Sequence, residues 1–218
     1  MPLFDSAKGD ISYGTALNLM GASGVAASFM GLASLALPSS TSTIFGGGTG
    51  TFLDEGNLYR YISAGISPAA TGTDNVLAVY TLLAGSFDIA GRGLNFVAQG
   101  NFAANSNNKR VKIFVGCTAA VVGSTVSGGT AIADSGTLTT SGAGWALEAN
   151  LFKYGATGSN TQIGIHQSAQ AGSTIAALLS PQALTLTESL PIIIAITGNA
   201  ATAVSDIVLN FAEVNAMN

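Results

Sequence analysis

The stretch that decides the fold runs from Val76 to Gly116, with the sequence VLAVYTLLAGSFDIAGRGLNFVAQGNFAANSNNKRVKIFVG. Three apolar runs in it are separated by turn-forming Gly, Asn and Asp residues. Short runs of this kind predict consecutive antiparallel strands joined by tight turns. The stretch also contains four of the seven basic residues of the chain, which are Arg92, Lys109, Arg110 and Lys112.

The two faces of these predicted strands differ, because side chains alternate from one face to the other. The apolar face of each strand is predicted to be core, with members Leu94, Phe96, Ala98, Val111, Ile113, Val115, Trp145, Leu147, Ala149 and Leu151. The opposite face is interrupted by the apolar residues Val97, Phe114, Phe152 and Tyr154. A solvated outer face is normally polar throughout. Val97, Phe114 and Phe152 are therefore candidate subunit contacts, although single exposed apolar residues also occur without any partner.

The same β pattern continues to the end of the chain. Further strands are predicted at 58–63, 86–89, 145–155, 161–169, 190–198 and 205–214. About eight strands with turn signals between them are typical of a sandwich or a barrel. Helical periodicity and internal repeats are absent from this region.

Charge is scarce in this protein. Asp, Glu, Lys and Arg make up 8% of the 218 residues, whereas an average domain has roughly 25%. Soluble monomers usually carry a mixed, charged surface. The composition instead favours a surface of uncharged polar groups that is partly buried against other copies or other proteins. A net charge of −4 also argues against nucleic-acid binding, which needs a basic footprint.

Residues 1–55 differ from the rest. No charged side chain occurs between Ile11 and Leu53, and the segment 16–37 is rich in small residues. Its length suits a transmembrane helix, but it contains Asn, Ser and Gly and lacks aromatic and basic anchors. A secretory signal would need a basic start. We therefore expect no membrane span but an extended or partly helical attachment arm, with predicted contacts at Leu17, Met20, Phe29, Met30 and Leu32.

No constellation of catalytic residues is recognisable. His166 is the only histidine and Cys117 the only cysteine, and they are interpreted as an ordinary strand residue and a small buried residue. No nucleophile elbow, zinc-protease, CxxC or calcium-loop motif occurs. The adjacent Asp54 and Glu55 would point in opposite directions in a strand, so no glycosidase pair is indicated. We expect no enzyme activity, no cofactor and no metal site.

Two polar or aromatic features have alternative interpretations. The basic cluster of Lys109, Arg110 and Lys112 could contact an anionic sugar or nucleic acid, but it is interpreted as a solvated strand entry, where Lys disfavours edge pairing. Trp145, the tyrosines and the Asn-rich turn at 105–108 could form a sugar-binding platform. Aromatic residues at strand starts are more often core.

The segments GLNFVAQGNFAANSNNKRVKIFVG (93–116), WALEANLFKYG (145–155), LPIIIAITG (190–198) and SDIVLNFAEVNAMN (205–218) carry a resemblance to a known family. In pattern and order they resemble the jelly-roll domains of tailed-bacteriophage virion proteins, which include head decoration or cement proteins and head or tail fibres. The resemblance covers residues 57–218 and involves no catalytic motif. It implies homotrimers fixed on the capsid or at a fibre tip.

The sequence therefore predicts an all-β, antiparallel jelly-roll-like sandwich of about eight strands at 56–218, preceded by an attachment arm and linker at 1–55. The function expected from it is that of a virion structural protein. In this role it would bind the major capsid protein or another virion protein through its arm, stabilise the head shell as a decoration or cement protein, and form a homotrimer through its β domain. The alternative is a receptor- or carbohydrate-binding fibre protein that contacts a host-surface glycan.

Overall fold

The computed structural model of the protein describes residues 42–43, 46–47, 57–87 and 89–217. The chain divides into one unit before Asn57 and a second unit from Asn57 onward. In the first unit, the described residues form a short antiparallel pair of β1 (Ser42–Thr43) with β2 (Gly46–Gly47). The rest of the predicted arm lies outside the described residues, and so do its predicted contacts Leu17, Met20, Phe29, Met30 and Leu32.

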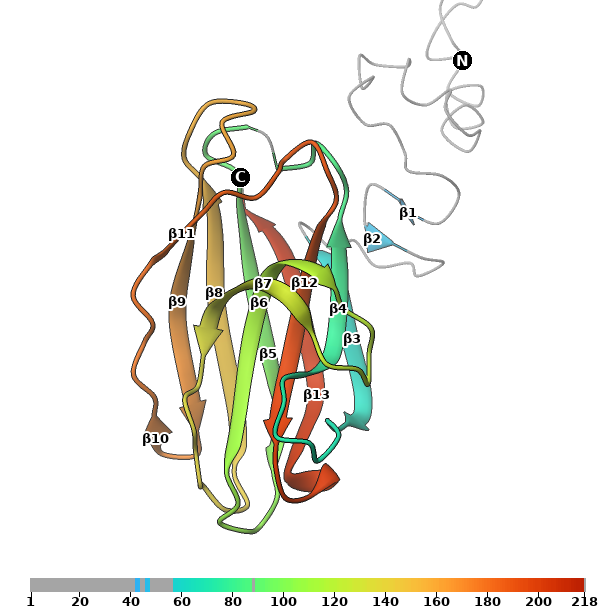
Figure 1. The fold of residues 1–218 in the computed structure, drawn as a ribbon, viewed down its shortest axis with the longest axis vertical. Helices are drawn as coiled ribbons and strands as arrows, with labels where there is room; N and C mark the ends of the chain where they lie inside the picture. The colour runs from blue at the N-terminus through green and yellow to red at the C-terminus, as the bar shows by residue number, and fades with distance from the viewer. Residues whose placement is uncertain (1–41, 44–45, 48–56, 88, 218) are drawn as a thin grey trace, which may run out of the picture. The chain divides into compact units, whose positions relative to one another are not determined.

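The second unit consists of two antiparallel sheets (Figure 1). The seven-stranded sheet has the order β10 (Thr174–Ile175), β9 (Gln162–Ala171), β8 (Gly144–Lys153), β5 (Gly93–Phe102), β13 (Ile207–Met217) and β3 (Asn57–Ile66), with β11 (Gln182–Leu184) also paired to β9. The four-stranded sheet has the order β4 (Asn75–Leu82), β12 (Ile192–Ala200), β6 (Lys109–Ala119) and β7 (Ser127–Asp134).

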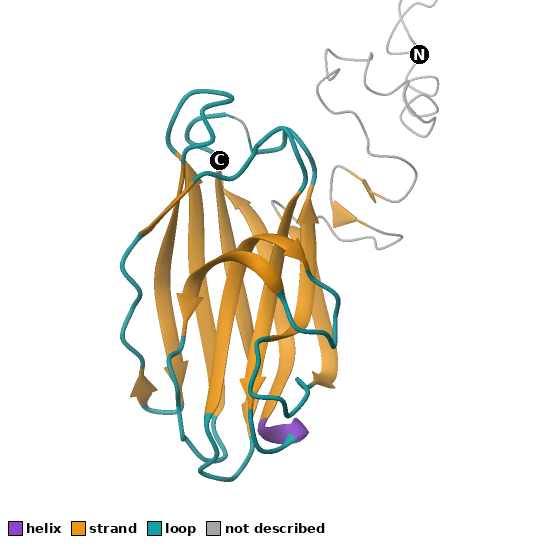
Figure 2. Ribbon diagram, in the orientation of Figure 1, coloured by secondary structure: helices purple, strands orange, loops and turns teal. Residues whose placement is uncertain are grey.

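The described residues contain almost no helix, as Figure 2 shows. A single 3-10 turn at Val204–Asp206 leads into β13. Across the described ranges there is no helix with the length and apolar character needed to cross a membrane.

The strand pairing is nested, and this makes the sandwich a jelly roll. Leaving aside β9 to β11, the first strand of the unit pairs with the last, β3 with β13, and the second with the second-last, β4 with β12. Inside them β5 pairs with β8 and β6 pairs with β7. A long hairpin rolled up in this way places alternate pairs in the two sheets. The predicted antiparallel jelly-roll sandwich of about eight strands is confirmed, and β9 to β11 extend its larger sheet beyond β8.

The core lies between the two sheets, on the faces that the period-two pattern predicts. All ten residues of the predicted apolar faces are at most 3% exposed. Trp145 is one of these ten residues. Its ring stacks on Phe102, with the ring centroids 6.0 Å apart. Its Nε1 donates a hydrogen bond to the carbonyl of Val208 over 3.2 Å. Gly100 on β5 makes room for the indole, because a Cβ there would lie 2.8 Å from two ring carbons.

Several features differ from the predicted strands, among them the short strands β10 and β11, which were not predicted. A strand was predicted at 86–89, but its described residues 86, 87 and 89 belong to a turn and a bend, and the Ser86 amide donates to the carbonyl of Leu83 over 3.2 Å. The strand β7 was not predicted, because Gly128 and Gly129 obscure its alternation. Both glycines have positive φ, and β7 is joined to β6 through two register shifts. Its last three residues, Ile132 to Asp134, are nevertheless all buried, and Ile132 is fully so.

Candidate interaction surfaces

Charged side chains are few in the described part of the second unit, and most of them contact one another. The six basic and six acidic residues are Arg60, Arg92, Lys109, Arg110, Lys112 and Lys153, and Asp74, Asp134, Glu148, Glu188, Asp206 and Glu213. Four ion pairs join eight of them, and these pairs are Arg60–Glu213, Arg110–Asp134, Lys112–Asp74 and Lys153–Glu188. Most of the charge is therefore neutralised within the unit.

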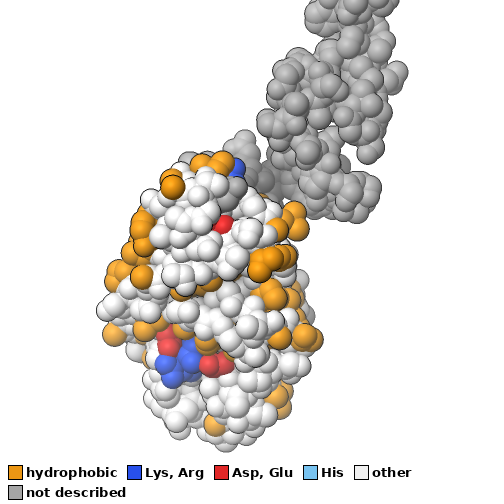
Figure 3. All heavy atoms as spheres, turned by 45° about the horizontal axis from the view of Figure 1, so that its top comes forward, with side chains coloured by type: hydrophobic (Ala, Val, Ile, Leu, Met, Phe, Trp, Pro, Cys, Tyr) orange, Lys and Arg blue, Asp and Glu red, His pale blue; other side chains and the backbone are white. Residues whose placement is uncertain are grey.

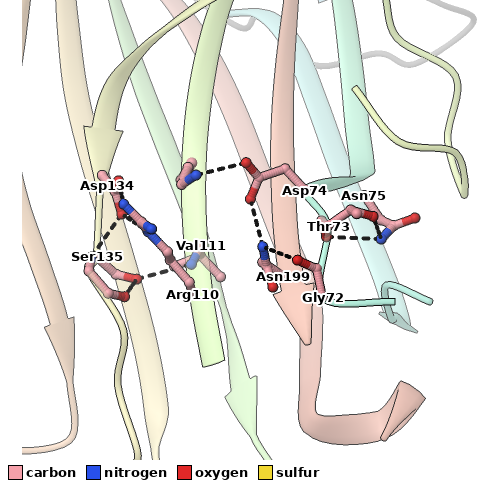
Figure 4. Close-up of polar contacts among 11 residues, drawn as sticks. Gly72, Thr73, Asp74, Asn75, Arg110, Val111, Asp134, Ser135 and Asn199 are labelled. Atoms are coloured by element: carbon pink, nitrogen blue, oxygen red, sulfur yellow. Dashed lines mark hydrogen bonds and ion pairs between the residues drawn. The ribbon is translucent and has the colours of Figure 1, made fainter. Parts of the chain in front are cut away.

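Two of the ion pairs form a row across the outer face of the four-stranded sheet (Figure 4). The Arg110 guanidinium donates two hydrogen bonds to the Asp134 carboxylate, and its Nε lies 2.7 Å from Oδ1. Beside it, Lys112 Nζ lies 2.7 Å from Oδ2 of Asp74, and Asn199 Nδ2 donates to Oδ1 of the same residue over 3.3 Å. Figure 3 shows charged atoms of both signs gathered in one patch, while most of the visible surface is uncharged.

Within this row, the Arg110–Asp134 pair does not titrate near neutral pH. Burial raises the pKa of the Asp134 carboxyl, but hydrogen bonds from Arg110 and from the Gly136 amide lower it more, so that it lies below its ordinary value. The hydrogen bond to Asp134 likewise raises the pKa of Arg110. Both groups therefore stay charged, and the ion pair is a permanent part of the sheet surface.

The Asn-rich turn before β6 encloses a buried lysine. The side chain of Lys109 is fully buried, and its Nζ donates to the carbonyl oxygens of Asn105 and Asn107 over 2.8 and 2.9 Å. The amides of the same two asparagines donate to the fully buried carboxylate of Asp206 over 2.7 and 3.0 Å. Burial raises the pKa of Asp206, but these amide hydrogen bonds lower it more.

The predicted solvated strand entry is therefore wrong. Lys109 lies inside, where an uncompensated charge would cost several kcal/mol. Arg110 and Lys112 reach the surface only as members of ion pairs. The signal was present in the sequence, because Lys109 has the same parity along β6 as the predicted core residues Val111 and Ile113.

A second buried cluster lies at the other end of the sandwich. Lys153 Nζ is 2.5 Å from Glu188 Oε1, and Gln162 Nε2 donates to the same oxygen over 2.6 Å. Ser159 Oγ accepts from Lys153 over 2.8 Å, and the Gly158 amide donates to Glu188 over 3.2 Å. Burial raises the pKa of Glu188, but the contact with Lys153 lowers it more. The cluster ties the connections after β8 and β11 to the strand ends.

The outer face of the seven-stranded sheet carries a row of amide side chains. Asn57, Asn215, Asn95 and Asn150 lie opposite one another on β3, β13, β5 and β8. Asn57 donates to Asn215 over 3.0 Å, and Asn95 donates to Asn150 over 2.9 Å. Asn95 also donates to Glu148 over 3.1 Å. The neighbouring row of the same face carries the charged residues Arg60, Glu213 and Glu148.

Two of the predicted contact residues lie on this face. Val97 on β5 is opposite Glu213 of β13 on one side and Glu148 of β8 on the other. The Phe152 ring lies over Gly93 of β5, where a Cβ would be 2.8 Å from its carbons. Both side chains are half-buried. They are outward-facing, as the alternation predicts.

The third predicted contact residue, Phe114, is covered by its own chain. The connection between β6 and β7, residues 120–126, folds back over the four-stranded sheet and is hydrogen-bonded to Val76 at the edge of β4. Phe114 packs there in a small apolar cluster with Val76 and Cys117. Lys112 Nζ lies 5.5 Å from its ring centroid.

One end of the sandwich gathers exposed apolar side chains. It is the end where β3 begins and β13 finishes, and where β4 is connected to β5, β8 to β9 and β11 to β12 (Figure 1). The exposed residues, from 39% to 70% accessible, are Leu58, Leu83, Ile89, Tyr154 and Leu190. A pocket of about 390 Å³ lies beside Leu58 and Leu83, and another of about 340 Å³ lies beside Leu190. We call this surface the apolar end.

The thiol of Cys117 and the imidazole of His166, the groups best suited to chemistry, are buried. No set of three or more His, Cys, Asp or Glu side chains within the described ranges is arranged to hold a metal ion. Burial raises the pKa of the Cys117 thiol to about 11, so that it is protonated at neutral pH. His166 is 4% exposed on β9 and accepts a hydrogen bond from the Leu179 amide over 2.9 Å.

Comparisons with known proteins add little information on this protein. No protein-family model matches the sequence, and no curated protein matches it. Among solved structures, the chain is similar to an engineered GH43 glycoside hydrolase with endo-xylanase and exo-arabinofuranosidase activity, at 11% identity and a TM-score of 0.35 over 66% of this chain. The match spans only 34% of that enzyme.

The chain is also similar to the CBM2 module of the evolved Dit of Lactobacillus casei BL23 phage J-1. The identity is 11% and the TM-score 0.33, over 71% of this chain and 76% of that one. Likenesses of this strength carry no information on function, which has to be argued from the residues.

Proposed function

We propose that the protein is a structural component of a bacteriophage virion, a head decoration or cement protein. In this role it self-associates through the jelly-roll unit, as a homotrimer, and attaches to the shell through residues 1–55. The observation that carries the proposal is that charged side chains bind one another within the subunit. Of the twelve charged residues described from Asn57 onward, eight form four ion pairs, and Lys109 and Asp206 belong to one enclosed cluster.

A surface of this kind suits a subunit in permanent contact with others. Charge normally keeps free monomers apart, and here it is replaced by amide, hydroxyl and apolar groups. The apolar end supplies a surface for such contacts, since clustered exposed apolar side chains mark interaction sites in soluble proteins. The jelly-roll order adds support, because capsid proteins commonly use it.

Native mass spectrometry of the full chain tests self-association, with a trimer as the expected species at micromolar concentration. A strict monomer would contradict the proposal. A variant lacking residues 2–50 tests attachment. It is expected to remain a folded trimer and to lose binding to virions that lack the protein. If the truncated chain bound these particles as well as the full chain, the role given to the arm would be wrong.

The second candidate function is that of a receptor- or carbohydrate-binding fibre protein. The observation that favours it is the row of Asn95, Asn150 and Glu148 beside the half-buried Phe152, because amides and carboxylates can bond sugar hydroxyls next to an aromatic ring. Trp145 cannot serve as the platform, since it is 3% exposed. In the turn at 105–108, the amides of Asn105 and Asn107 are not available to a sugar, since they are bonded to Asp206.

A glycan array with the full chain tests this candidate. Binding that is lost in Asn95→Ala and kept in Asn101→Ala, a control on the same face of β5, would support it. Absence of binding to every host-surface glycan would count against it.

A further inference from the structure

A long excursion of the chain follows the edge of the larger sheet. After β9 the chain turns back, and residues 172–186, here called the strap, run along β9 (Figure 1). The strap pairs with β9 only near its two ends, where Thr174 lies opposite Ala171 and Ala183 lies opposite Ile163. Between them, residues 177–181 form no ladder with β9.

One side chain holds this middle part. His166, at the centre of β9, accepts a hydrogen bond at Nδ1 from the Leu179 amide over 2.9 Å. On β8 its neighbour is Ala149, so the ring lies on the core side of the sheet. Leu178, by contrast, is 54% exposed. Within the described structure, the contact with His166 is the one hydrogen bond between residues 177–181 and β9.

The protonation state of His166 follows from this bond. Because Nδ1 accepts, the imidazole is neutral and carries its proton on Nε2. Nε2 is buried and forms no hydrogen bond with any described residue. A second proton would have to enter at Nδ1, the atom that the Leu179 amide occupies.

We propose that His166 is an acid-sensitive latch for the strap. Protonation of Nδ1 turns the acceptor into a donor that faces the Leu179 N–H, and the middle of the strap is released from β9. The ends remain paired through β10 and β11. Release uncovers the central edge of β9, which forms no ladder with the strap even in the closed state, and an exposed strand edge is a template for another strand.

The surroundings set the pH at which the latch works. Burial lowers the pKa of His166 below its ordinary value of 6.5, while the Ser168 backbone and the Asp134 carboxylate oppose this shift without cancelling it. Asp134 is the charged group facing His166 from β7 and is bonded to Arg110. The neighbouring residue on β8 is Ala149, Gln182 on β11 is uncharged, and the strap contains no charged residue. The latch is therefore closed at neutral pH and opens in acid.

Hydrogen exchange of the full chain tests the proposal. Protection factors, which correct for the intrinsic effect of pH, are compared at pH 7.5 and at values down to 5. The Leu179 amide and its strap neighbours are expected to lose protection about tenfold for each pH unit below the His166 pKa. Core amides, such as that of Ala98 on β5, are expected to stay protected. Since His166 is the only histidine of the chain, no other imidazole contributes to a transition in this range.

His166→Gln is the matched variant, because its amide oxygen can accept from Leu179 and does not titrate. It is expected to keep the strap protected at pH 5. A strap with pH-independent protection in the natural chain would overturn the proposal, and so would loss of strap and core protection together. If the variant fails to fold, the NMR titration of His166 in the natural chain decides. The proposal requires the chemical shift of the Leu179 amide to change with the same midpoint pH as the titration of His166. A different midpoint for the amide would overturn it.

Discussion

Lys153 Nζ and Glu188 Oε1 lie 2.5 Å apart, and both side chains are at most 2% exposed. Lys153 ends β8, while Glu188 belongs to the connection between β11 and β12. The pair therefore fixes an irregular segment to the sheet from the inside. Neither residue can lose its partner without leaving a buried charge, and this makes the pair a sharp test of the fold.

Lys153→Met should destabilise the protein by about 3–5 kcal/mol, because it leaves the Glu188 carboxylate buried without its cation. Urea denaturation measures the change in the free energy of unfolding. The matched control is Arg60→Met, which breaks the more exposed pair with Glu213 and should cost about 1 kcal/mol or less. Equal losses in the two variants would show that Lys153 is not buried as described.

Asp206 gives a prediction on acid stability. Its pKa is lowered in the folded state, so the unfolded state binds more protons and the stabilisation is present above the ordinary pKa of 3.8. It is lost as the pH falls through the folded pKa. Asn107→Ala removes one donor to the carboxylate and should cost about 1.5–3 kcal/mol at pH 7. This difference from the parent should shrink below about pH 4.

Urea denaturation at a series of pH values checks this, with both chains carrying His166→Gln so that no histidine titrates. A difference that stayed constant down to pH 2.5 would mean that Asn107 does not act through the carboxylate of Asp206.

Gly100 provides a test of the packing between β5 and Trp145. A Cβ at Gly100 would lie 1.8 Å from the carbonyl oxygen of Val208, whereas one at Gly144 would meet nothing nearer than 3.8 Å. Gly100→Ala is therefore expected to destabilise the protein by about 1–3 kcal/mol through overpacking. Gly144→Ala should be tolerated much better. Thermal unfolding followed by tryptophan fluorescence compares them, and similar melting temperatures would argue against the described approach of the strands.

The alternation of side chains was enough to predict the sheets. It assigned Trp145 and Val111 to the core, because a buried face repeats every second residue whatever the partner strand is. The same parity places Lys109 and Lys153 inside, but a charged residue is expected to face solvent until its partner is known. Those partners are distant in sequence. Glu188 is 35 positions from Lys153, and only the rolled-up topology brings the two together.

Other features depend on geometry that no local pattern encodes. Phe114 faces outward as predicted, yet the connection at 120–126 covers it, and a Gly- and Ser-containing loop gives no sign of where it folds. The strand β7 was missed because its two glycines with positive φ look like turn residues. The apolar end is likewise assembled from the start of β3 and three separate connections, so its members are scattered along the sequence.

The apolar end gives the test of self-association. Leu83 and Leu190 are 70% and 59% exposed, so replacing both by Asp should leave the fold intact. If copies meet at this end, two buried carboxylates per subunit should weaken association at least about tenfold, since each costs more than 1 kcal/mol in an interface core. Val204→Asp is the control, because Val204 is 57% exposed in the turn between β12 and β13, at the opposite end. Sedimentation measures all three chains, and equal association by the double variant and the natural chain would exclude the apolar end as the contact.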